Sequence, residues 1–408
     1  MKKNKILNFR NKAKKIDLPL KQLELIRKAF KVLNGKVMMV GGVVRNIILS
    51  KKEIVDTDLV TDLNPDEMVR CFKISKIKYL ETGMKFGTIT AIVEQTSIQI
   101  TSLRQDILPD GRWTKVVYTK NWFLDSQRRD FTINAIYLNL DGEIFDPFDG
   151  INDLKTKKVI FIGTPRDRIK EDYLRILRFL RFSIQYSEVF DKVGLKECMK
   201  MKSKLNMISF ERRYSEFIKM ISYINFEENF KKLIETNILN YIFGLKIYTK
   251  NIEKYFKIEK SYKFEDPLRR VKFFLRAKKD LSSRDFYNKL SNDVKKRIQS
   301  KFKFKNYDFE SINYELYYHS KTLVLDQLIF DFVDGLVQKK IFNNLLNFIK
   351  TWKRVKFPIS GDDLILIGYN NGLLIGRNIT IIEKWWLKKL CSPDRKSCLD
   401  FEKTLPRS

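Results

Sequence analysis

The chain changes character near residue 165, and this change restricts its fold more than any other feature. Before about residue 145, short runs of β-branched residues alternate with helix-like segments, and Gly-Gly or Asp-Gly pairs separate them. After about residue 165, Gly and Pro become rare, while Leu, Ile and Phe recur at helical spacing. This pattern predicts an α+β protein. A head built from a small mixed β-sheet with helices is followed by an all-helical remainder.

Three segments of the head predict strands. "KVMMVGG" (36–42) is typical of a buried strand that ends in a turn. The stretch 87–104 is β-branched and roughly alternating on either side of a polar "EQTS", which indicates a β-hairpin. The stretch 131–148 repeats that pattern, and Asp141-Gly142 supplies the expected turn of a second hairpin.

The later segments predict helices. "EDYLRILRFLRFS" (171–183) and "KKRIQSKFKF" (295–304) have apolar residues at helical spacing. The stretch 357–390 contains four glycines in its first part, and it predicts a short Gly-punctuated connector that leads into an amphipathic helix.

Positive charge favours a polyanionic partner. The chain has 80 Lys and Arg against 49 Asp and Glu, a formal net charge of +31, although a composition rich in Lys, Asn, Ile and Phe explains part of the excess. Residues 250–305 hold 19 Lys and Arg against 7 Asp and Glu, interleaved with Tyr and Phe. This stretch is either the solvated face of a helical domain or a track for backbone phosphates.

The cysteines and the apolar runs point to a cytoplasmic protein. Cys71, Cys198, Cys391 and Cys398 match no common zinc pattern, and the chain has a single histidine, so reduced thiols are expected. The basic N-terminal segment lacks the apolar run of a secretory signal. No stretch approaches the about 20 apolar residues of a membrane span, so we expect no membrane association.

Two acids lie close together in this basic chain. Asp56 and Asp58 are two residues apart in an apolar stretch, and on a strand they would project from the same face. Two unpaired carboxylates that close repel each other, and a Mg²⁺ ion would relieve the repulsion. An Asp-x-Asp pair alone is weak support for a metal site, because it often occurs by chance.

A glycine turn upstream strengthens this interpretation. Gly41 and Gly42 close a predicted strand and open a predicted helix, with Arg45 in its first turn. Glycines allow a phosphate to approach the backbone, and the N–H groups at a helix start favour anions. Together with the acids, this arrangement indicates a nucleoside-triphosphate site, whereas a tight turn would explain the glycines alone.

Several motifs in order resemble one enzyme family. The chain is similar to class II tRNA nucleotidyltransferases (CCA-adding enzymes), whose head is shared with bacterial poly(A) polymerases. The resemblance covers about residues 36–215, with a weaker match near 357–387. The motifs are "GGVVRN", "DTDLVTDLNPDEM", "ETGMKFGTITA", "SLRQDILPDGRW", "RRDFTINAIYLNLDGEIFDPFDG", "RIKEDYLRILRFLRF" and "SFERRYSEFIKMI".

The resemblance implies roles for residues near the phosphates and the sugar. It implies a palm-type nucleotidyltransferase head in which Asp56 and Asp58 are catalytic and hold Mg²⁺ ions. The triphosphate and ribose would be bound by Gly41, Gly42, Arg45, Arg129, Asp130 and Asn134.

The resemblance also implies a protein template for base choice. Asp172 and Arg175 would hydrogen-bond the edge of CTP or ATP, and Glu171 and Arg178 would hold that pair in register. As residues i and i+3 of one predicted helix, Asp172 and Arg175 would be neighbours. The alternative is an ordinary surface ion pair. "SLRQDILPDGRWT" (102–114) looks like the flexible loop with which the family changes from C to A addition.

Some residues depart from the family pattern. Asn46 stands where an aspartate is usual, and Phe86 and Trp113 stand where histidine is frequent. Gln99 replaces a glutamate that would be the third acid of the site, so it keeps hydrogen bonding without the charge.

The resemblance therefore implies a four-part enzyme that binds tRNA. We predict a nucleotidyltransferase head (1–145), a neck that recognises the base (146–215), a basic body (216–350) and a tail (351–408) that contact tRNA. The enzyme would add C, C and A to the tRNA 3′ end from CTP and ATP, with the acceptor stem bound. The alternatives are a poly(A) polymerase and a catalytically weak RNA-binding protein.

Overall fold

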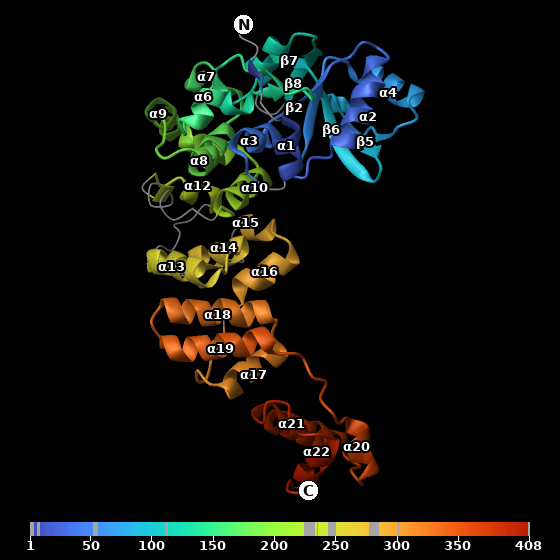
Figure 1. Ribbon diagram of the computed structural model, residues 1–408. Coiled ribbons are helices and arrows are strands. Elements are labelled where there is room, and N and C mark those ends of the chain that lie inside the picture. The colour runs from blue at the N-terminus through green and yellow to red at the C-terminus, as the bar shows by residue number, and fades with distance from the viewer. Residues whose placement is uncertain are drawn as a thin grey trace. The chain divides into compact units, whose positions relative to one another are not determined.

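The protein divides into two compact units in a computed structural model. Unit 1 comprises Met1–Lys246 and unit 2 comprises Ile247–Ser408 (Figure 1). The structure describes residues 4–5, 9–51, 56–110, 113–223, 233–234, 236–243, 250–276, 285–300 and 302–406. Unit 1 contains all of the described strands, and the described part of unit 2 is helical.

Unit 1 is built on a mixed sheet, as predicted. The strand order is β1-β10-β9-β2-β3-β6-β5-β4, in which β3 and β6 are parallel and the other neighbours are antiparallel. The strands are β1 (Asn4–Lys5), β2 (Val37–Val40), β3 (Asp58–Thr61), β4 (Lys78–Leu80), β5 (Thr88–Val93), β6 (Thr96–Ser102), β9 (Tyr137–Leu138) and β10 (Glu143–Phe145).

The predicted hairpins are confirmed. β5 and β6 are joined through Glu94 and Gln95, both with positive φ (46° and 69°), which matches the twist of a tight hairpin. β9 and β10 turn at Gly142, with φ 83°. The stretch predicted to be a flexible loop forms a separate antiparallel pair, β7 (Arg104–Asp110) and β8 (Trp113–Tyr118), and residues 111–112 lie outside the described residues.

Helices cover one face of this sheet. α2 (Leu20–Lys31), α3 (Gly42–Leu49) and α4 (Pro65–Ile74) pack their buried side chains against Ile89, Ala91, Ile98 and Ile100 of β5 and β6. α1 (Phe9–Lys15) joins the same core through Phe9 and Ala13. The opposite face carries a smaller cluster that includes Val40, Val60, Leu103 and Tyr137. The catalytic candidate Asp58 lies on this second face, because it alternates with the core residue Leu59.

Helices also form the remainder of unit 1. They are α5 (Trp122–Gln127), α6 (Gly150–Lys155), α7 (Pro165–Glu171), α8 (Arg175–Tyr186), α9 (Lys192–Met201), α10 (Phe210–Ile221) and α12 (Leu239–Phe243).

The single helix predicted over 171–183 is wrong at its start. α7 ends at Glu171, Asp172 is extended with φ −154°, and α8 begins at Arg175. The Asp172 carboxylate accepts a hydrogen bond from the backbone N–H of Leu174 (3.0 Å), an arrangement that competes with helix formation. Asp172 and Arg175 therefore flank a break between two helices.

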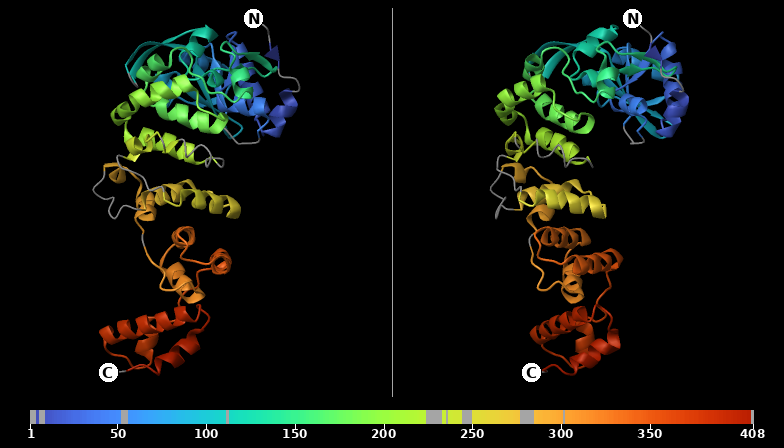
Figure 2. Two further views of the ribbon diagram at one scale, coloured as in Figure 1. Left: turned by 90° about the vertical axis from the view of Figure 1, so that its left-hand side faces the viewer. Right: turned by 60° about the vertical axis from the view of Figure 1, so that its left-hand side comes forward.

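Unit 2 contains paired helices, of which α18 and α19 lie side by side (Figure 2). The predicted helix over 295–304 is shorter than expected, because α16 ends at Gln299, and the predicted connector itself contains the short helix α20. The helices are α13 (Ile252–Tyr262), α14 (Pro267–Leu275), α15 (Asp285–Asn288), α16 (Asn292–Gln299), α17 (Phe309–Tyr318), α18 (Lys321–Val333), α19 (Lys339–Thr351), α20 (Gly361–Leu366), α21 (Gly372–Lys388) and α22 (Arg395–Glu402).

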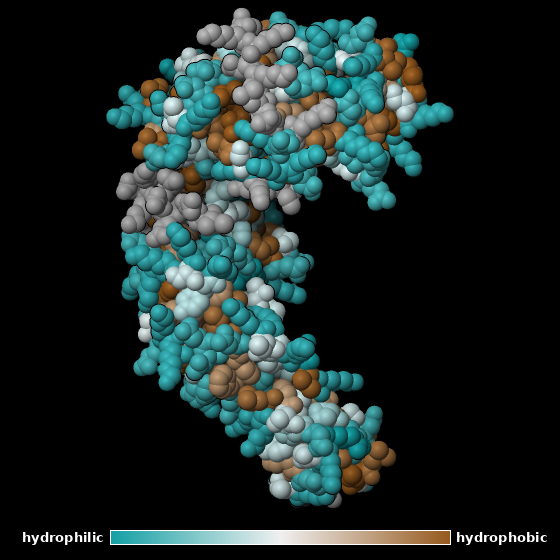
Figure 3. All heavy atoms as spheres, in the orientation of Figure 1, coloured by the Kyte–Doolittle hydropathy of each residue, from teal (hydrophilic) through white to brown (hydrophobic). Residues whose placement is uncertain are grey.

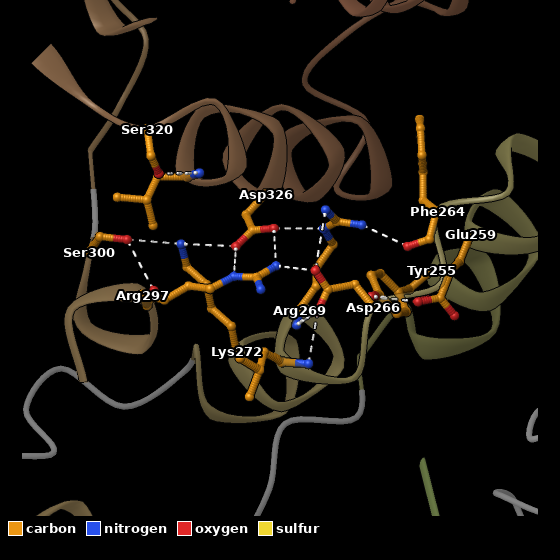
Figure 4. Close-up of polar contacts among 12 residues, drawn as sticks. Tyr255, Glu259, Phe264, Asp266, Arg269, Lys272, Arg297, Ser300, Ser320 and Asp326 are labelled. Atoms are coloured by element: carbon orange, nitrogen blue, oxygen red, sulfur yellow. Dashed lines mark hydrogen bonds and ion pairs between the residues drawn. The ribbon is translucent and has the colours of Figure 1, made fainter. Parts of the chain in front are cut away.

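Part of the basic stretch 250–305 is turned inward. Asp326 of α18 is fully buried and accepts hydrogen bonds from Nε of Arg269 (2.6 Å) and Nε of Arg297 (2.9 Å), as Figure 4 shows. Arg297 also donates to Asp266 (2.6 Å), and Lys272 lies 3.7 Å from Asp326. Both interpretations of the basic stretch, a solvated helical face and a track for backbone phosphates, are wrong for Arg269, Lys272 and Arg297. Their charges are compensated inside unit 2.

Arg269, Arg297 and Lys272 form a cluster with only two carboxylates, Asp266 and Asp326. Lys272 is the cation in excess. Burial lowers the pKa of Lys272 to about 8. At neutral pH the folded protein therefore loses free energy of unfolding by keeping this side chain protonated. We expect Lys272→Met to raise the free energy of unfolding at pH 7 by about 2 kcal/mol. This gain should shrink between pH 8 and 10.5, where the unfolded wild-type chain binds more protons than the folded one, so wild-type stability rises. Urea denaturation of both proteins at pH 7 and pH 10 measures the difference. An equal difference at both pH values would contradict this account.

The four cysteines are free thiols, as predicted, and Cys71, Cys198 and Cys398 are buried. None of the described helices is long and apolar enough to cross a bilayer. Hydrophilic residues cover most of the face drawn in Figure 3.

Candidate functional site

A cavity in unit 1 brings most of the predicted site residues together. It has a volume of about 540 Å³, and seven arginines line it beside only three carboxylates. The lining includes the predicted residues Gly41, Gly42, Arg45, Asp58, Arg129, Asp130, Asn134, Asp172, Arg175 and Arg178. It also includes Arg104, Arg128, Leu174, Phe182 and Arg212, which the sequence did not indicate. Such an excess of guanidinium groups suits a ligand with several negative charges.

The glycine turn forms one wall of this cavity. β2 ends at Val40, and Gly41 has φ 76° and ψ −129°, a conformation that L side chains rarely adopt. α3 begins at Gly42, so its first N–H groups border the cavity. Arg45, in the first turn of α3, is buried over the ring of Phe182 and donates a hydrogen bond to Oδ1 of Asn134. This wall therefore combines helix N–H groups with a fixed guanidinium.

The two candidate catalytic acids occupy different positions. Asp58 is the first residue of β3 and lines the cavity, and its strand partner in β6 is Gln99. Asp56 precedes the strand and lines a separate cavity of about 700 Å³, so the prediction that both acids lie on the strand is wrong for Asp56. The side chain of Asp58 is exposed, but the cavity walls remove part of its solvent. This desolvation and the nearby charge of Asp56 raise the pKa of Asp58, while Arg129 and Arg45 oppose the shift.

Asp56 and Asp58 could bind a cation only if water and substrate phosphates supply its remaining ligands. Among the described residues, no three His, Cys, Asp or Glu side chains are grouped as a metal site. Mg²⁺, however, is often held by one or two carboxylates together with water and substrate phosphates. Desolvation and then the charge of Asp56 raise the pKa of Asp58, and a bound cation would compensate the repulsion between the two carboxylates. The two carboxylates are therefore of the chemical type that such an ion takes, although Asp56 lines the neighbouring cavity.

A buried carboxylate holds two of the cavity arginines. Asp125 of α5 is fully buried and accepts hydrogen bonds from Nε of Arg128 (2.8 Å), Nη2 of Arg129 (3.1 Å) and the Tyr137 hydroxyl (2.8 Å). The backbone N–H of Arg104, at the start of β7, also donates to it (3.3 Å). Asp125 thus fixes Arg129 at the cavity wall and ties the β7–β8 pair to the same place.

Asp130 holds the next arginine. It accepts hydrogen bonds from Nδ2 of Asn134 (2.8 Å) and Nε of Arg178 (2.7 Å). Burial alone would raise the pKa of Asp130, but the charge of Arg178 and the Asn134 hydrogen bond lower it to about 2. Asp130 is therefore a permanent anion between two groups that also line the cavity.

Asp172 and Arg175 have separate partners. Asp172 accepts from Nη2 of Arg212 in α10 (2.7 Å). Arg175 donates Nη1 to Glu171 (2.6 Å) and Nη2 to the carbonyl oxygen of Arg128 (3.1 Å). Glu171 does not line the cavity, but it orients Arg175. The cavity therefore contains a hydrogen-bond acceptor, Asp172, and a donor, Arg175, that are not paired with each other.

The site residues that were not predicted differ in how visible they are in the sequence. Arg128 and Arg212 lie inside the quoted motifs "RRDFTINA" and "SFERRYSEFIKMI", so their position was visible although their role was not. Nothing in the spacing of Asp125 distinguishes it from an exposed helix residue; only its burial in the fold does.

Comparisons with known proteins agree with this geometry. Residues 37–160 match the family model described as Poly A polymerase head domain, and 191–246 match the model described as Probable RNA and SrmB- binding site of polymerase A. The chain is 32% identical over 370 residues to CCA tRNA nucleotidyltransferase 1, mitochondrial, of Danio rerio, covering 85% of this chain and 82% of that protein. It is 28% identical over 407 residues to the Homo sapiens protein of the same name, covering 93% and 89%.

A solved structure shares the fold. The Bacillus stearothermophilus CCA-adding enzyme in complex with CTP superposes with a TM-score of 0.73 at 21% identity, covering 95% of this chain and 98% of that one.

Proposed function

Because the chain belongs to the family of CCA tRNA nucleotidyltransferases, we propose that it adds C, C and A to the 3′ end of tRNA from CTP and ATP, and that it releases pyrophosphate at each step. The observation that carries the proposal is the arginine-lined cavity, in which the N-terminus of α3 and Asp58 lie on one wall. A nucleoside triphosphate is a polyanion that would satisfy these guanidinium and N–H groups.

The reaction assigns a task to each wall of the cavity. Gly41, Gly42 and Arg45 would bind the triphosphate, and Arg129, Asp130 and Asn134 would contact the ribose. The 3′-oxygen of the RNA forms a bond to the α-phosphorus, and the bond from that phosphorus to the pyrophosphate oxygen breaks. The proton of the hydroxyl leaves to solvent in the balanced reaction, and the neutral amide of Gln99 is not a base that could accept it.

Nucleotidyl transfer in this family depends on a divalent cation. We assign Asp56 and Asp58 as the residues that would hold Mg²⁺, and the bound ion would supply neutralisation of phosphate charge and activation of the attacking hydroxyl. The exposure of both carboxylates and the raised pKa of Asp58 support this assignment.

Base choice would rest on Asp172 and Arg175. A carboxylate only accepts hydrogen bonds and a guanidinium only donates them, so together they complement the edge of a cytosine or an adenine. Glu171 would keep Arg175 in place, and Arg178 would act through its ion pair with Asp130.

We expect Arg175→Ala to lower the selectivity between CTP and ATP at least about tenfold, because the base would lose a fixed donor. Steady-state kcat/KM for each nucleotide on tRNA that ends before CCA measures the ratio. Arg166→Ala, an exposed arginine of α7, is the matched control. Unchanged selectivity in Arg175→Ala would remove this residue from the template.

The alternative activity is poly(A) addition, which the match of residues 37–160 to a Poly A polymerase head domain supports. Labelled CTP or ATP, Mg²⁺ and tRNAs that end before, within and after CCA separate the two activities. Addition of two C and one A followed by arrest is expected. Long A tails would identify a poly(A) polymerase, and RNA binding without product would identify a catalytically weak RNA-binding protein.

The tRNA-binding roles of residues 216–350 and 351–408 stay predictions, as do the four domain boundaries. We propose that these helices contact the tRNA backbone by shape rather than by sequence. A cytoplasmic location also stays a prediction, because two of the relatives carry names that include the word mitochondrial.

A further inference from the structure

Lys272 of unit 2 differs from the two arginines that share its buried cluster. Arg269 and Arg297 donate directly to the carboxylate of Asp326, and a guanidinium is not deprotonated in proteins. The ammonium of Lys272 lies 3.7 Å from Oδ2 of Asp326, and it donates a hydrogen bond to Oγ of Ser300 (3.0 Å), as Figure 4 shows. Lys272 is therefore the cation of this cluster that can become neutral without leaving Asp326 unpaired.

The charge of Lys272 is in excess of what the cluster compensates. Asp326 pairs with both arginines, and Asp266 pairs with Arg297 (2.6 Å), so two cations already balance these two carboxylates. Burial lowers the pKa of Lys272 to about 8, and near neutral pH a larger share of this amine is unprotonated than in an ordinary lysine. An unprotonated amine has the lone pair that a nucleophile needs.

A cavity of about 600 Å³ lies against Lys272. Its walls include the apolar side chains of Ile298, Phe302 and Phe330, and the centre of the Phe330 ring is 6.0 Å from Nζ of Lys272. Only 4% of the Lys272 side chain is exposed, so a reagent would approach the amine through this cavity. The apolar walls suit a short acyl chain rather than a sugar or a base.

The charged groups of the cavity leave room for an anion beside these walls. Arg276 donates to both oxygens of Asp334 (2.9 and 3.0 Å), and Asp331 accepts a hydrogen bond from Gln327 (2.7 Å). Lys303 also lines the cavity, is exposed, and forms no ion pair with a described residue. The two carboxylates are therefore engaged by other side chains, while the ammonium of Lys303 is available to a phosphate group.

We propose that Lys272 is a site of acylation by small acyl phosphates. The apolar walls would hold the acyl chain, and Lys303 would hold the phosphate. The unprotonated amine of Lys272 attacks the carbonyl carbon, and the bond between that carbon and the phosphate oxygen breaks. The phosphate leaves with the bonding electrons and takes up the proton that the nitrogen releases.

The product would remove the excess charge of the cluster. An acylated Lys272 is neutral, but its nitrogen keeps one N–H that can still donate to Ser300. Two arginines and two carboxylates would then remain in the interior of unit 2. Acylation therefore stabilises unit 2, because the folded chain no longer encloses an uncompensated cation.

Acetyl phosphate and the unaltered full chain test the reactivity of Lys272. The protein is incubated with acetyl phosphate near neutral pH, and the acetylated fraction of each lysine is followed over time by peptide mass spectrometry. We expect Lys272 to react at least about tenfold faster than Lys353, an exposed lysine of unit 2, because the cluster favours the unprotonated amine. In concentrated urea the two rates should be equal. A rate for Lys272 no higher than that of Lys353 in the folded protein, or the same preference in urea, would overturn the proposal.

Hydrogen exchange tests the consequence for unit 2. Treatment with acetyl phosphate should slow native-state exchange of peptides from α14, α16 and α18 at least about tenfold in the wild type. Lys272→Arg keeps the positive charge but offers no such amine, so its exchange should not change on treatment. Lys353→Arg is the matched control and should respond as the wild type does. Equal slowing in Lys272→Arg and the wild type, or no slowing in a wild type whose Lys272 is acetylated, would overturn the proposal.

Discussion

Asp58→Asn is expected to lower the rate of nucleotide incorporation at least about a thousandfold while the protein stays folded. Asparagine keeps the shape of the side chain but removes the charge that would hold Mg²⁺ at the α-phosphate. Asp58 is exposed at the start of β3, and among the described residues no side chain forms an ion pair with it, so its loss should cost little stability. Single-turnover incorporation of labelled CTP on tRNA that ends before CCA, with saturating enzyme, measures the chemical step.

The control for this experiment is Asp66→Asn. Asp66 is an exposed aspartate in the first turn of α4, on the other side of the same sheet, and its replacement should leave the rate unchanged. Equilibrium binding of tRNA and thermal unfolding should be the same for wild type and both variants. A rate for Asp58→Asn within about tenfold of wild type would mean that another group carries the metal chemistry.

The arginines of the cavity are fixed before any ligand arrives. Arg129 is held by Asp125, Arg178 by Asp130, Arg212 by Asp172 and Arg175 by Glu171. A guanidinium that is already oriented loses less side-chain entropy when it meets a phosphate or a base. The carboxylates around the cavity therefore do more than balance charge, since they set the direction of the remaining donors.

Local patterns predicted the elements of the sheet well and the helix ends poorly. The hairpins at Glu94-Gln95 and at Gly142 follow from alternation and turn chemistry, which act over a few residues. The break at Asp172 could not be predicted, because helical spacing continues through it and its cause is one side-chain hydrogen bond to Leu174.

The sequence motifs predicted which residues belong to the site, but they did not predict how these residues are arranged. The motifs named ten of the residues that line the cavity, but neither the separation of Asp56 from it nor the buried contacts of Asp125 leave a trace in the sequence. The same limit applies to the basic stretch of unit 2. A count of charges cannot reveal that Arg269 and Arg297 turn inward to meet Asp326, a residue of a later helix.

Asp326→Ala is expected to lower the free energy of unfolding of unit 2 by about 3–5 kcal/mol. The carboxylate is fully buried and holds Arg269 and Arg297, so its removal leaves three cations with only Asp266 to balance them. Urea denaturation followed by hydrogen exchange of peptides from α14, α16 and α18 reports on unit 2 separately from the helices of unit 1. Asp293→Ala, which removes an exposed aspartate at the start of α16, should change the value by no more than about 0.5 kcal/mol.

A second substitution separates charge from packing in this cluster. If the cost of Asp326→Ala comes from unpaired cations, Lys272→Met should stabilise Asp326→Ala by more than the about 2 kcal/mol that it adds to wild type, because it removes a cation that has lost its nearest carboxylate. If the cost comes from a cavity, Lys272→Met should add the same free energy of unfolding in both backgrounds, since Met and Lys fill similar space. Binding of CTP to unit 1 should stay unchanged in both variants, as Asp326 and Lys272 belong to unit 2. A stability loss below about 1 kcal/mol in Asp326→Ala would show that water reaches the arginines and that their burial does not depend on this carboxylate.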